Sequence, residues 1–437
     1  MTWKVTLLMF HGPLQNPPQR LLNLPRALTL IVNGNFDQSF SSDDTRGTGR
    51  LRNLGQWHRK NSFGIVANVN GQTVFTSSSS AQARIIQAIT VDPQYLYTVN
   101  FDFGGNASLL IYMFNKNQKL LGYTLPTKNS SSGTATIEVP ANVEYLQVLA
   151  YTSNKGWIDN MTLAQVDEPD TDNDGIVDRL DDYPQNATKS FASFYPLIGR
   201  QTLAFEDLWP HTGDFDFNDL VLSNLMEYAA DTSGQLVDAN YKVMVNANGA
   251  GIASGVAMVL LQPNGQPFNS NIISSVSGDA TLDPDVTNGI IVFDHISQAL
   301  AKPYANNGQG HDGTPEEFEF QIGFNQNIGS SRVLADIYMF RAGERGREIH
   351  LDGFGPTAAA DPSLFNTGQD INGTYSTKTG LPWAIEIVYP GTTFFRHPLE
   401  KVDILKAYPN FQTWAESNGS KQVGWMIHPD NDKVYKF

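Results

Sequence analysis

Short runs of β-branched and aromatic residues recur along the chain from Ala27 onward, separated by Gly, Asn, Asp and Pro. Such runs predict β-strands, because branched and aromatic side chains pack well on a pleated sheet. The runs before residue 166 are ALTLIVNGNF, QARIIQAITVD, YLYTVNFDF, SLLIYMF, TATIEVP, EYLQVLAYT and WIDNMTLAQV. No helical period separates them, so we expect a β-sandwich of roughly eight strands here.

A second series of strands begins near Ser190, after the hydrophobic pattern has stopped at Val166. Its runs are DLVLSNLMEY, NYKVMVNANG, GVAMVLLQ, GIIVFDHI, EFEFQIGFN, VLADIYMF and WAIEIVY. Near the end, PLEKVDILKAYPNFQTWAES predicts short helical segments broken by Pro409. The expected fold is therefore all-β, with two jelly-roll-like β-sandwich domains and short C-terminal helices.

These patterns divide the chain into four parts. Residues 1–27 are Pro-rich and aperiodic, which predicts an arm that is flexible or ordered only against a partner. A first β domain follows over 28–166, an aspartate-rich linker over 167–189, and a second β-rich domain over 190–437.

Composition narrows the candidate functions. The net charge of -15 disfavours nucleic acid or an anionic membrane surface as a partner. The chain has no cysteine, which excludes disulfides, iron–sulfur clusters and thiolate zinc sites. No run approaches the ~20 apolar residues of a membrane-spanning helix. The apolar run Val5 to Phe10 is shorter than the ~7–15 residues of a signal-peptide core, so the export route and the true N-terminus stay open.

The linker carries the clearest chemical pattern, DTDNDGIVDRLDDYP from Asp170. It fits the spacing D-x-D-x-D-G-x5-D through Asp170, Asp172, Asp174, Gly175 and Asp181. Alternate carboxylates of a tight loop can converge on one ion, and calcium takes six to eight oxygens at ~2.3–2.6 Å. The carbonyl of Ile176 would supply position seven and Asp178 position nine, directly or through water. We expect a Ca²⁺ site here; the alternative is an acidic, solvated linker.

A second group of acids follows in FEDLWPHTGDFDFNDLVL. Asp214, Asp216 and Asn218 alternate, so an extended segment would point all three one way and Phe215 and Phe217 the other. The pattern predicts a second cation site, whose candidate ligands are Glu206, Asp207, Asp214, Asp216, Asn218 and Asp219. The alternative is an ordinary half-buried strand with polar residues facing water.

Several motifs resemble known families. The same acidic segment, with REIHLDGFGPT, LPWAIEI and PLEKVDILKAYPNFQTWAES, resembles the LruC-type domain of bacterial exported proteins over about residues 190–437. That resemblance implies a β-rich, surface-exposed protein without established enzyme activity, although this chain lacks a lipobox cysteine. The linker, with Pro184 following, resembles the calcium loops of thrombospondin type 3 repeats without their cysteines.

The first domain is similar to jelly-roll carbohydrate-binding modules in VNGNFD, QAITVDPQYLYTVNFDF and GWIDNMTL. The resemblance implies a structural calcium held by Asp37 near the first strand and Asp159 near the last. Sugar rings stack on aromatic faces, so the candidate contacts are Trp57, Tyr97, Tyr112, Tyr151 and Trp157. Each could equally be a core or edge residue of its strand.

Enzyme chemistry finds little support in the sequence. A glycosidase needs two carboxylates ~5–9.5 Å apart across a cleft. Glu317 and Glu319 instead lie on the solvent face of a predicted strand, and Phe318 and Phe320 lie on its opposite face. There is no H-E-x-x-H, G-x-S-x-G or P-loop motif. We therefore expect a non-catalytic protein, with a glycoside hydrolase as the weaker alternative.

The resulting hypothesis is an extracellular or bacterial cell-surface protein stabilised by Ca²⁺, with a structural or adhesive role. Its expected partner is a glycan or a cell-surface or matrix protein. An alternative is a fibre subunit that binds copies of itself, in which the arm of residues 1–27 adds a strand to the next subunit.

Overall fold

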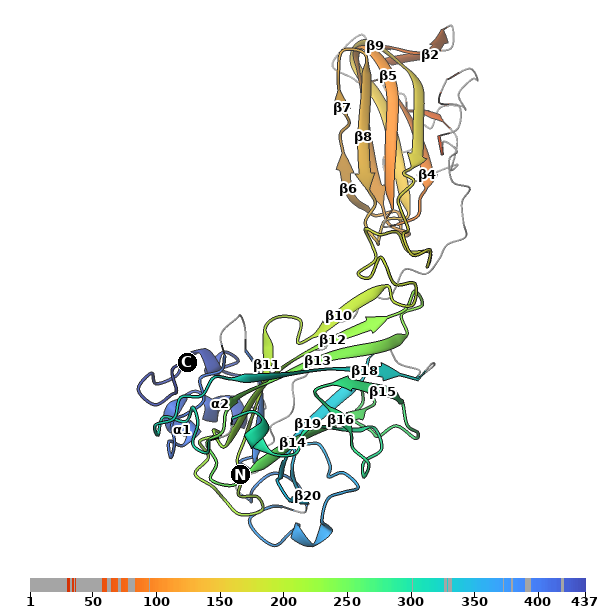
Figure 1. Ribbon diagram of the computed structural model, residues 1–437. Helices are drawn as coiled ribbons and strands as arrows, with labels where there is room; N and C mark the ends of the chain where they lie inside the picture. The colour runs from red at the N-terminus through yellow and green to blue at the C-terminus, as the bar shows by residue number, and fades with distance from the viewer. Residues whose placement is uncertain are drawn as a thin grey trace. The chain divides into compact units, whose positions relative to one another are not determined.

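The computed structural model describes residues 30–31, 34, 36, 57–60, 64–69, 72–77, 83–93, 95–300, 302–325, 328, 332–371, 373–378, 380–389, 394–417 and 420–437. The chain forms two compact units, and it passes from one to the other between Pro169 and Asp170 (Figure 1). We call Asn16–Pro169 the N-terminal unit and Asp170–Phe437 the C-terminal unit. The predicted arm of residues 1–27 and the candidate ligand Asp37 lie outside the described residues.

The N-terminal unit is an antiparallel β structure, and nine strands of its described residues belong to one hydrogen-bonded sheet, folded into two layers. The strands are β1 (His58–Lys60), β2 (Gly64–Val69), β3 (Gln72–Ser77), β4 (Ala83–Thr90), β5 (Leu96–Phe114), β6 (Leu120–Thr124), β7 (Thr127–Lys128), β8 (Ser132–Glu138) and β9 (Tyr145–Gln165). The central order is β1-β4-β9-β5-β8-β7, and β6 pairs with β5. Alternate residues such as Val99, Leu109 and Val148 point inward and form one apolar core.

Strands β5 and β9 are longer than the sequence suggests. Each unites two predicted strands, and the two pair with each other along most of their length. The register shifts between Asn100 and Asp102 and between Gly105 and Ala107, and such bulges bend a strand without ending it. Gly105 has a φ of +64°, which glycine adopts at little cost. Gly105 therefore allows β5 to bend and continue at a position where the sequence pattern suggests a turn between two strands.

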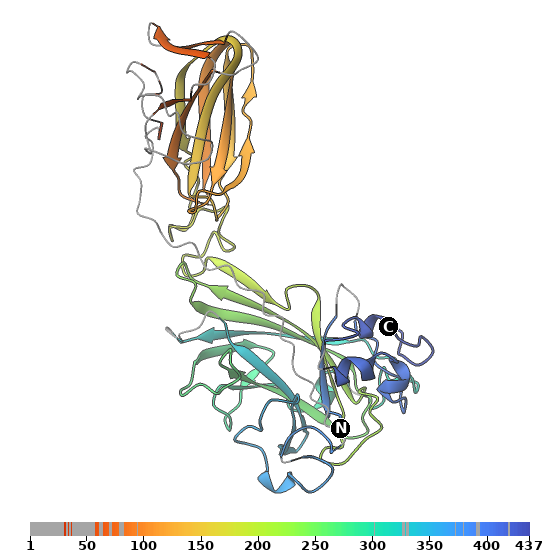
Figure 2. The same ribbon diagram turned by 180° about the vertical axis from the view of Figure 1, so that it is seen from behind.

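The C-terminal unit contains two antiparallel sheets packed face to face (Figure 2). The seven-stranded sheet holds β10 (Phe191–Tyr195), β11 (Arg200–Phe205), β12 (Leu220–Ala230), β13 (Leu236–Ala247), β15 (Ile273–Gly278), β18 (Glu316–Phe324) and β21 (Ala384–Tyr389). The five-stranded sheet holds β14 (Ser254–Leu261), β16 (Thr281–Leu282), β17 (Gly289–Phe293), β19 (Leu334–Arg341) and β20 (Glu344–Ile349). The core between them includes Tyr241 and Phe320 from one sheet and Met258 and Ile337 from the other.

The predicted C-terminal helices are confirmed as α1 (Ile404–Ala407) and α2 (Phe411–Glu416), with Pro409 between them. Single 3-10 turns lie at Ile296–Gln298, Pro362–Leu364 and Trp425–Ile427. The helices cover part of the other face of the seven-stranded sheet through a second core that includes Val221, Ile387, Phe411 and Trp425. In the described part of the chain, no helix has the length and apolar character needed to cross a bilayer. The all-β sandwich class expected from the sequence is confirmed.

Candidate metal centres

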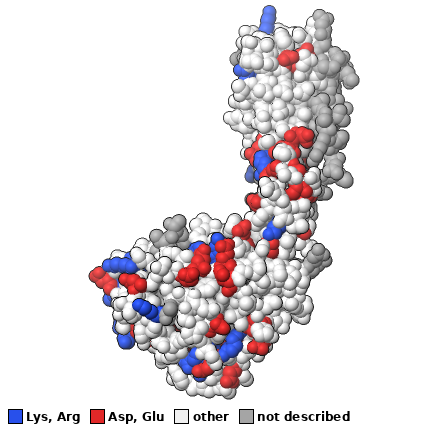
Figure 3. All heavy atoms as spheres, viewed as in Figure 1, with Lys and Arg blue, Asp and Glu red and all other residues white. Residues whose placement is uncertain are grey.

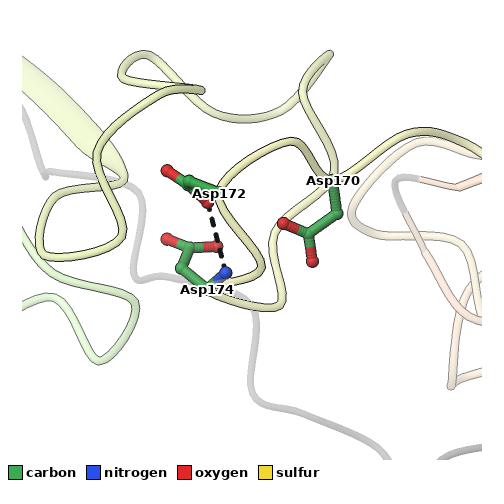
Figure 4. A group of neighbouring side chains, drawn as sticks. All are labelled: Asp170, Asp172 and Asp174. Carbon is green, nitrogen blue, oxygen red and sulfur yellow. Dashed lines mark hydrogen bonds between the residues drawn. The ribbon is translucent and has the colours of Figure 1, made fainter.

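The aspartate-rich segment of the C-terminal unit forms a tight loop that gathers three carboxylates. One oxygen each from Asp170, Asp172 and Asp174 lies within 4.8 Å of the others (Figure 4). The turn uses positive φ angles of 64° at Asn173 and 98° at Gly175, as tight loops with Asn and Gly do. Backbone amides hold the carboxylates in place, because Asp174 N donates to Asp172 Oδ1 at 3.2 Å and Gly175 N to Asp170 Oδ2 at 3.1 Å.

Other carboxylate oxygens of this loop are buried and accept no hydrogen bond. They are Asp170 Oδ1, Asp172 Oδ2 and Asp181 Oδ2. Only 7% of Asp181 is exposed, and burial raises its pKa, with the charges of Asp174 and Asp172 adding to the rise. Unpaired, buried anionic oxygens are costly unless a cation meets them. The residues present therefore fit a hard divalent cation such as Ca²⁺.

Two further predicted ligands of this loop have different surroundings. Both oxygens of Asp178 are engaged by Thr171, whose N and Oγ1 each donate at 2.7 Å. These contacts are compatible with position nine of such loops, which often meets the ion through water. Ile176 follows Gly175, and its N–H donates to Asp174 Oδ1 at 2.7 Å, so its backbone belongs to the same turn.

The loop is tied to the rest of the C-terminal unit. Ser190 Oγ donates to Asp174 Oδ2 at 2.5 Å, and Ser190 N donates to Ala230 O at the end of β12. Ala192 N in β10 donates to Asp182 Oδ2 at 2.7 Å. Any ion that orders the loop would therefore also stabilise the edge of the seven-stranded sheet.

The second acidic group forms a separate cluster at the ends of β11 and β12. One oxygen each from Glu206, Asp214 and Asp216 lies within 4.8 Å of the others. The expected extended strand is wrong, because this segment is irregular and Phe215 and Phe217 have φ angles of 56° and 51°. The segment instead wraps around Glu206, which is fully buried and accepts from Phe217 N at 2.7 Å and Phe215 N at 3.2 Å.

The electrostatics of this cluster favour the binding of a cation. Burial raises the pKa of Asp216 to about 7, and the charge of Asp214 adds to the rise. Burial also raises the pKa of Glu206 well above its usual value, with Asp219 and Asp216 contributing. Such carboxyls must either take up protons or share a cation.

The remaining predicted ligands of the cluster have their own partners. Asp207 N donates to Asp219 Oδ2 at 2.8 Å, and burial followed by the charge of Asp207 raises the pKa of Asp219. Asn218 Nδ2 donates to Pro398 O at 3.2 Å, while its buried Oδ1 has no hydrogen-bond partner. Glu400, which sequence reasoning missed, is close enough for the charge of Asp214 to raise its pKa after burial has done so. No pattern in the sequence links Glu400 to this cluster, because the two segments are far apart along the chain.

The metal ligand expected in the N-terminal unit is described only in part. Asp159 in β9 lies opposite Asp102 in β5. Asn160 bridges the pair, because its N donates to Asp159 Oδ1 at 2.8 Å and its Nδ2 to Asp102 Oδ2 at 2.9 Å. With Asp37 outside the described residues, the proposed pair of Asp37 and Asp159 stays a prediction.

The aromatic residues predicted to contact sugar separate into two groups. Trp57 and Tyr97 are buried in the core of the N-terminal unit, so neither ring can stack on a ligand. Trp157 is half-buried, and its ring lies directly over Gly104, where a Cβ would come within 2.2 Å of Nε1. Tyr112 and Tyr151 are half-buried on β5 and β9.

Comparisons with known proteins find one matching family model and several similar structures. A family model described as a domain of unknown function, DUF4842, matches residues 234–426. No curated protein matches the sequence. The chain is similar to the crystal structure of a candidate lipoprotein from Bacteroides ovatus, at 14% identity over 78% of this chain and 99% of that one, with a TM-score of 0.42.

Carbohydrate-binding modules also resemble this chain. A CBM4 structure is 14% identical, covers 31% of this chain and 99% of that one, and has a TM-score of 0.24. The tandem CBM22 domains of Paenibacillus barcinonensis Xyn10C are 9% identical, cover 67% of this chain and 87% of that one, and have a TM-score of 0.21. At such identities and TM-scores, the likeness says nothing about function.

Proposed function

We propose that this chain is a non-catalytic, calcium-stabilised β protein of the bacterial cell surface or extracellular space that binds glycan. The observation that carries the calcium part is the loop Asp170–Asp181, with its converging carboxylates and its buried oxygens without hydrogen bonds. The proposed metal ligands of this loop are carboxylate, carbonyl and water oxygens, which Ca²⁺ prefers. The cluster around Glu206 is proposed as a second centre, with Asp214 and Asp216 as its other carboxylate ligands.

Calcium titration tests this proposal. After treatment with EDTA, calcium at 100 times its dissociation constant is expected to stabilise the fold by about 2.7 kcal/mol for each site. Magnesium is expected to do less, because it demands near-ideal octahedral geometry. Thermal unfolding and isothermal titration calorimetry of the full chain give the stability change and the number of ions.

Paired variants connect the effect to the loop. Asp172→Asn is expected to bind one ion fewer than the parent chain, because it removes a converging carboxylate. Asp285→Asn changes an exposed aspartate outside both clusters and is the matched control. No binding heat and an unchanged melting temperature in millimolar calcium would disprove the calcium proposal.

The glycan part is supported by one face of the N-terminal unit. Tyr112 lies opposite Gln147 and Tyr151 lies opposite Ser108, so the β5–β9 register puts both tyrosines on the same face, four residues apart along the strands. Tyr123 on β6 lies opposite Tyr112, makes an edge contact with it at 6.2 Å and is 63% exposed. Tyrosine rings stack on sugars and their hydroxyls form hydrogen bonds, so this face could hold an extended glycan.

A glycan array with the full chain tests that face. Tyr123→Ala and Tyr112→Ala are each expected to weaken binding, whereas Tyr304→Ala, which changes an exposed tyrosine of the C-terminal unit, is expected to leave it unchanged. Glycan binding of unchanged strength after both changes in the N-terminal unit would show that the glycan does not bind this tyrosine face. Silence across diverse glycans would overturn the proposal and favour a protein partner.

The proposed location and lack of catalysis rest on the LruC-type resemblance of residues 190–437. That resemblance supports an exported protein with a structural or adhesive role. Protease treatment of intact producing cells tests the location, because a surface protein is digested while the cells stay closed. Complete protection of the chain until lysis would contradict it.

A further inference from the structure

A polar cleft lies on the seven-stranded sheet of the C-terminal unit, and none of the carboxylates of the two acidic clusters lines it. Part of the outer face of this sheet is covered by the C-terminal helices. Another part of this face, over β12, β13 and β18, carries a cleft of about 420 Å³ whose lining includes Glu227, Asp238, Asn240, Glu319 and Gln321. Figure 3 shows acidic and basic side chains gathered on this side of the unit. The volume falls within the ~300–1,000 Å³ of small-molecule sites.

The carboxylates of the cleft are held in position by groups of the chain itself. Lys189 Nζ pairs with Asp238 Oδ2 at 2.5 Å, and the hydroxyl of Tyr183 donates to Glu227 Oε1 at 2.8 Å. Glu319 Oε1 accepts from Asn240 Nδ2 at 2.9 Å and pairs with Lys242 at 3.3 Å. Each of these contacts uses one oxygen of its carboxylate, so the second oxygen of each is available as an acceptor.

These contacts indicate which ligand would suit the cleft. Three carboxylates face two lysines, so most of the negative charge is already balanced and a strongly cationic ligand gains little. Positioned acceptors and amides instead match a neutral ligand rich in hydroxyl groups. We infer that this cleft is a carbohydrate-binding site for one or two sugar residues, separate from the tyrosine face of the N-terminal unit.

The segment that follows the aspartate loop supplies one wall of the cleft. Tyr183 and Lys189 line it, and they follow the loop directly. Tyr183 N donates to Asp181 Oδ1 at 2.7 Å, and Ser190 Oγ, next to Lys189, donates to Asp174 Oδ2. The inference rests on the proposed function only here: if calcium orders the loop, calcium also positions this wall.

Saturation-transfer NMR and calorimetry on the full chain test the inference, with cellobiose, xylobiose and diacetylchitobiose as neutral probes and spermidine as the cationic one. The background carries Tyr112→Ala and Tyr123→Ala, which removes the proposed face of the N-terminal unit. In this background, Glu319→Ala is expected to weaken disaccharide binding about tenfold, the loss for a charge-assisted hydrogen bond. Glu319 is half-exposed, at 50%, so the fold should tolerate the change.

Matched variants make the outcomes distinct. Gln321→Ala is expected to weaken binding as Glu319→Ala does, whereas Glu316→Ala, on the same strand but outside the cleft, is expected to leave it unchanged. The inference would be overturned if no saturation passed from the protein to any disaccharide, if Glu319→Ala bound disaccharide as tightly as its background, or if the cleft preferred spermidine. Sugar binding that persists in EDTA would leave the sugar site standing and contradict only the role of calcium in positioning the wall formed by Tyr183 and Lys189.

Discussion

Raising the pH from 7 to 9 is expected to destabilise the C-terminal unit, because a buried histidine there retains a proton that the unfolded chain releases. His350 is fully buried, with Nδ1 at 2.7 Å from Asp336 Oδ2 and Nε2 at 3.0 Å from Glu348 Oε2. Burial lowers the pKa of His350, but the two carboxylates outweigh it and raise the pKa to about 9.

The sign and size of the effect follow from that difference. The unfolded histidine titrates near 6.5, so its stabilising contribution is complete below pH 6.5 and is lost as the pH rises through 9. Between those values the free energy of unfolding falls by about 1.4 kcal/mol per pH unit. The loss of unfolding free energy from pH 7 to 9 is therefore about 2 kcal/mol. It is smaller than twice the loss per pH unit, because folded His350 is already half deprotonated at pH 9.

Other groups around His350 do not obscure this window. Arg345 pairs with Glu348, and the rings of Tyr338 and Tyr375 lie 4.3 and 5.0 Å from the imidazole. Burial raises the pKa of both tyrosines, so neither ionises below pH 9 in the folded chain. Unfolded tyrosine is half ionised at about pH 10 and only about a tenth ionised at pH 9, so the measurement stops at pH 9.

Urea unfolding of the full chain at saturating calcium measures the effect at several pH values. His350→Gln is expected to lose the pH slope and to be destabilised by about 3–5 kcal/mol at pH 7, because it leaves buried Asp336 without its cation and Glu348 with Arg345 alone. His428→Gln changes an exposed histidine and is expected to keep the slope. A parent chain with constant stability from pH 7 to 9, or an equal slope in His350→Gln, would refute the reasoning.

Three further changes test local features. Gly175→Ala, at a φ of 98°, is expected to lower stability by about 1–2 kcal/mol in thermal unfolding and to weaken calcium binding. Gly122→Ala, where an added Cβ meets open space, is the control and is expected to change neither stability nor calcium binding. Tyr97→Phe is expected to lose about 1 kcal/mol of stability, from the hydrogen bond that its hydroxyl accepts from Asp92 N, and no glycan affinity; reduced affinity in an array would contradict its assignment to the core. Glu206→Gln is expected to raise the melting temperature in EDTA, by relieving repulsion in the cluster, and to reduce the gain on adding calcium; a lower melting temperature in EDTA would argue against that repulsion.

Features written in consecutive residues could be predicted from the sequence. The alternation in EEFEFQIGF places Phe318 and Phe320 in the core and Glu319 in solvent, as observed for β18. The aspartate loop could be proposed because its candidate ligands lie within twelve positions of Asp170, and a glycine marks the turn. Local geometry alone brings such groups together, so little depends on the rest of the fold.

The tertiary structure decided whatever depends on distant residues or on coverage. The approach of Glu400 to Asp214 joins segments far apart in the chain, and left-handed backbone at Phe215 and Phe217 replaced the expected strand. A period of two likewise shows that a strand has two faces but not which face another layer covers. Tyr97 and Tyr112 therefore look alike in the sequence, and packing alone puts the first in the core and leaves the second at the surface.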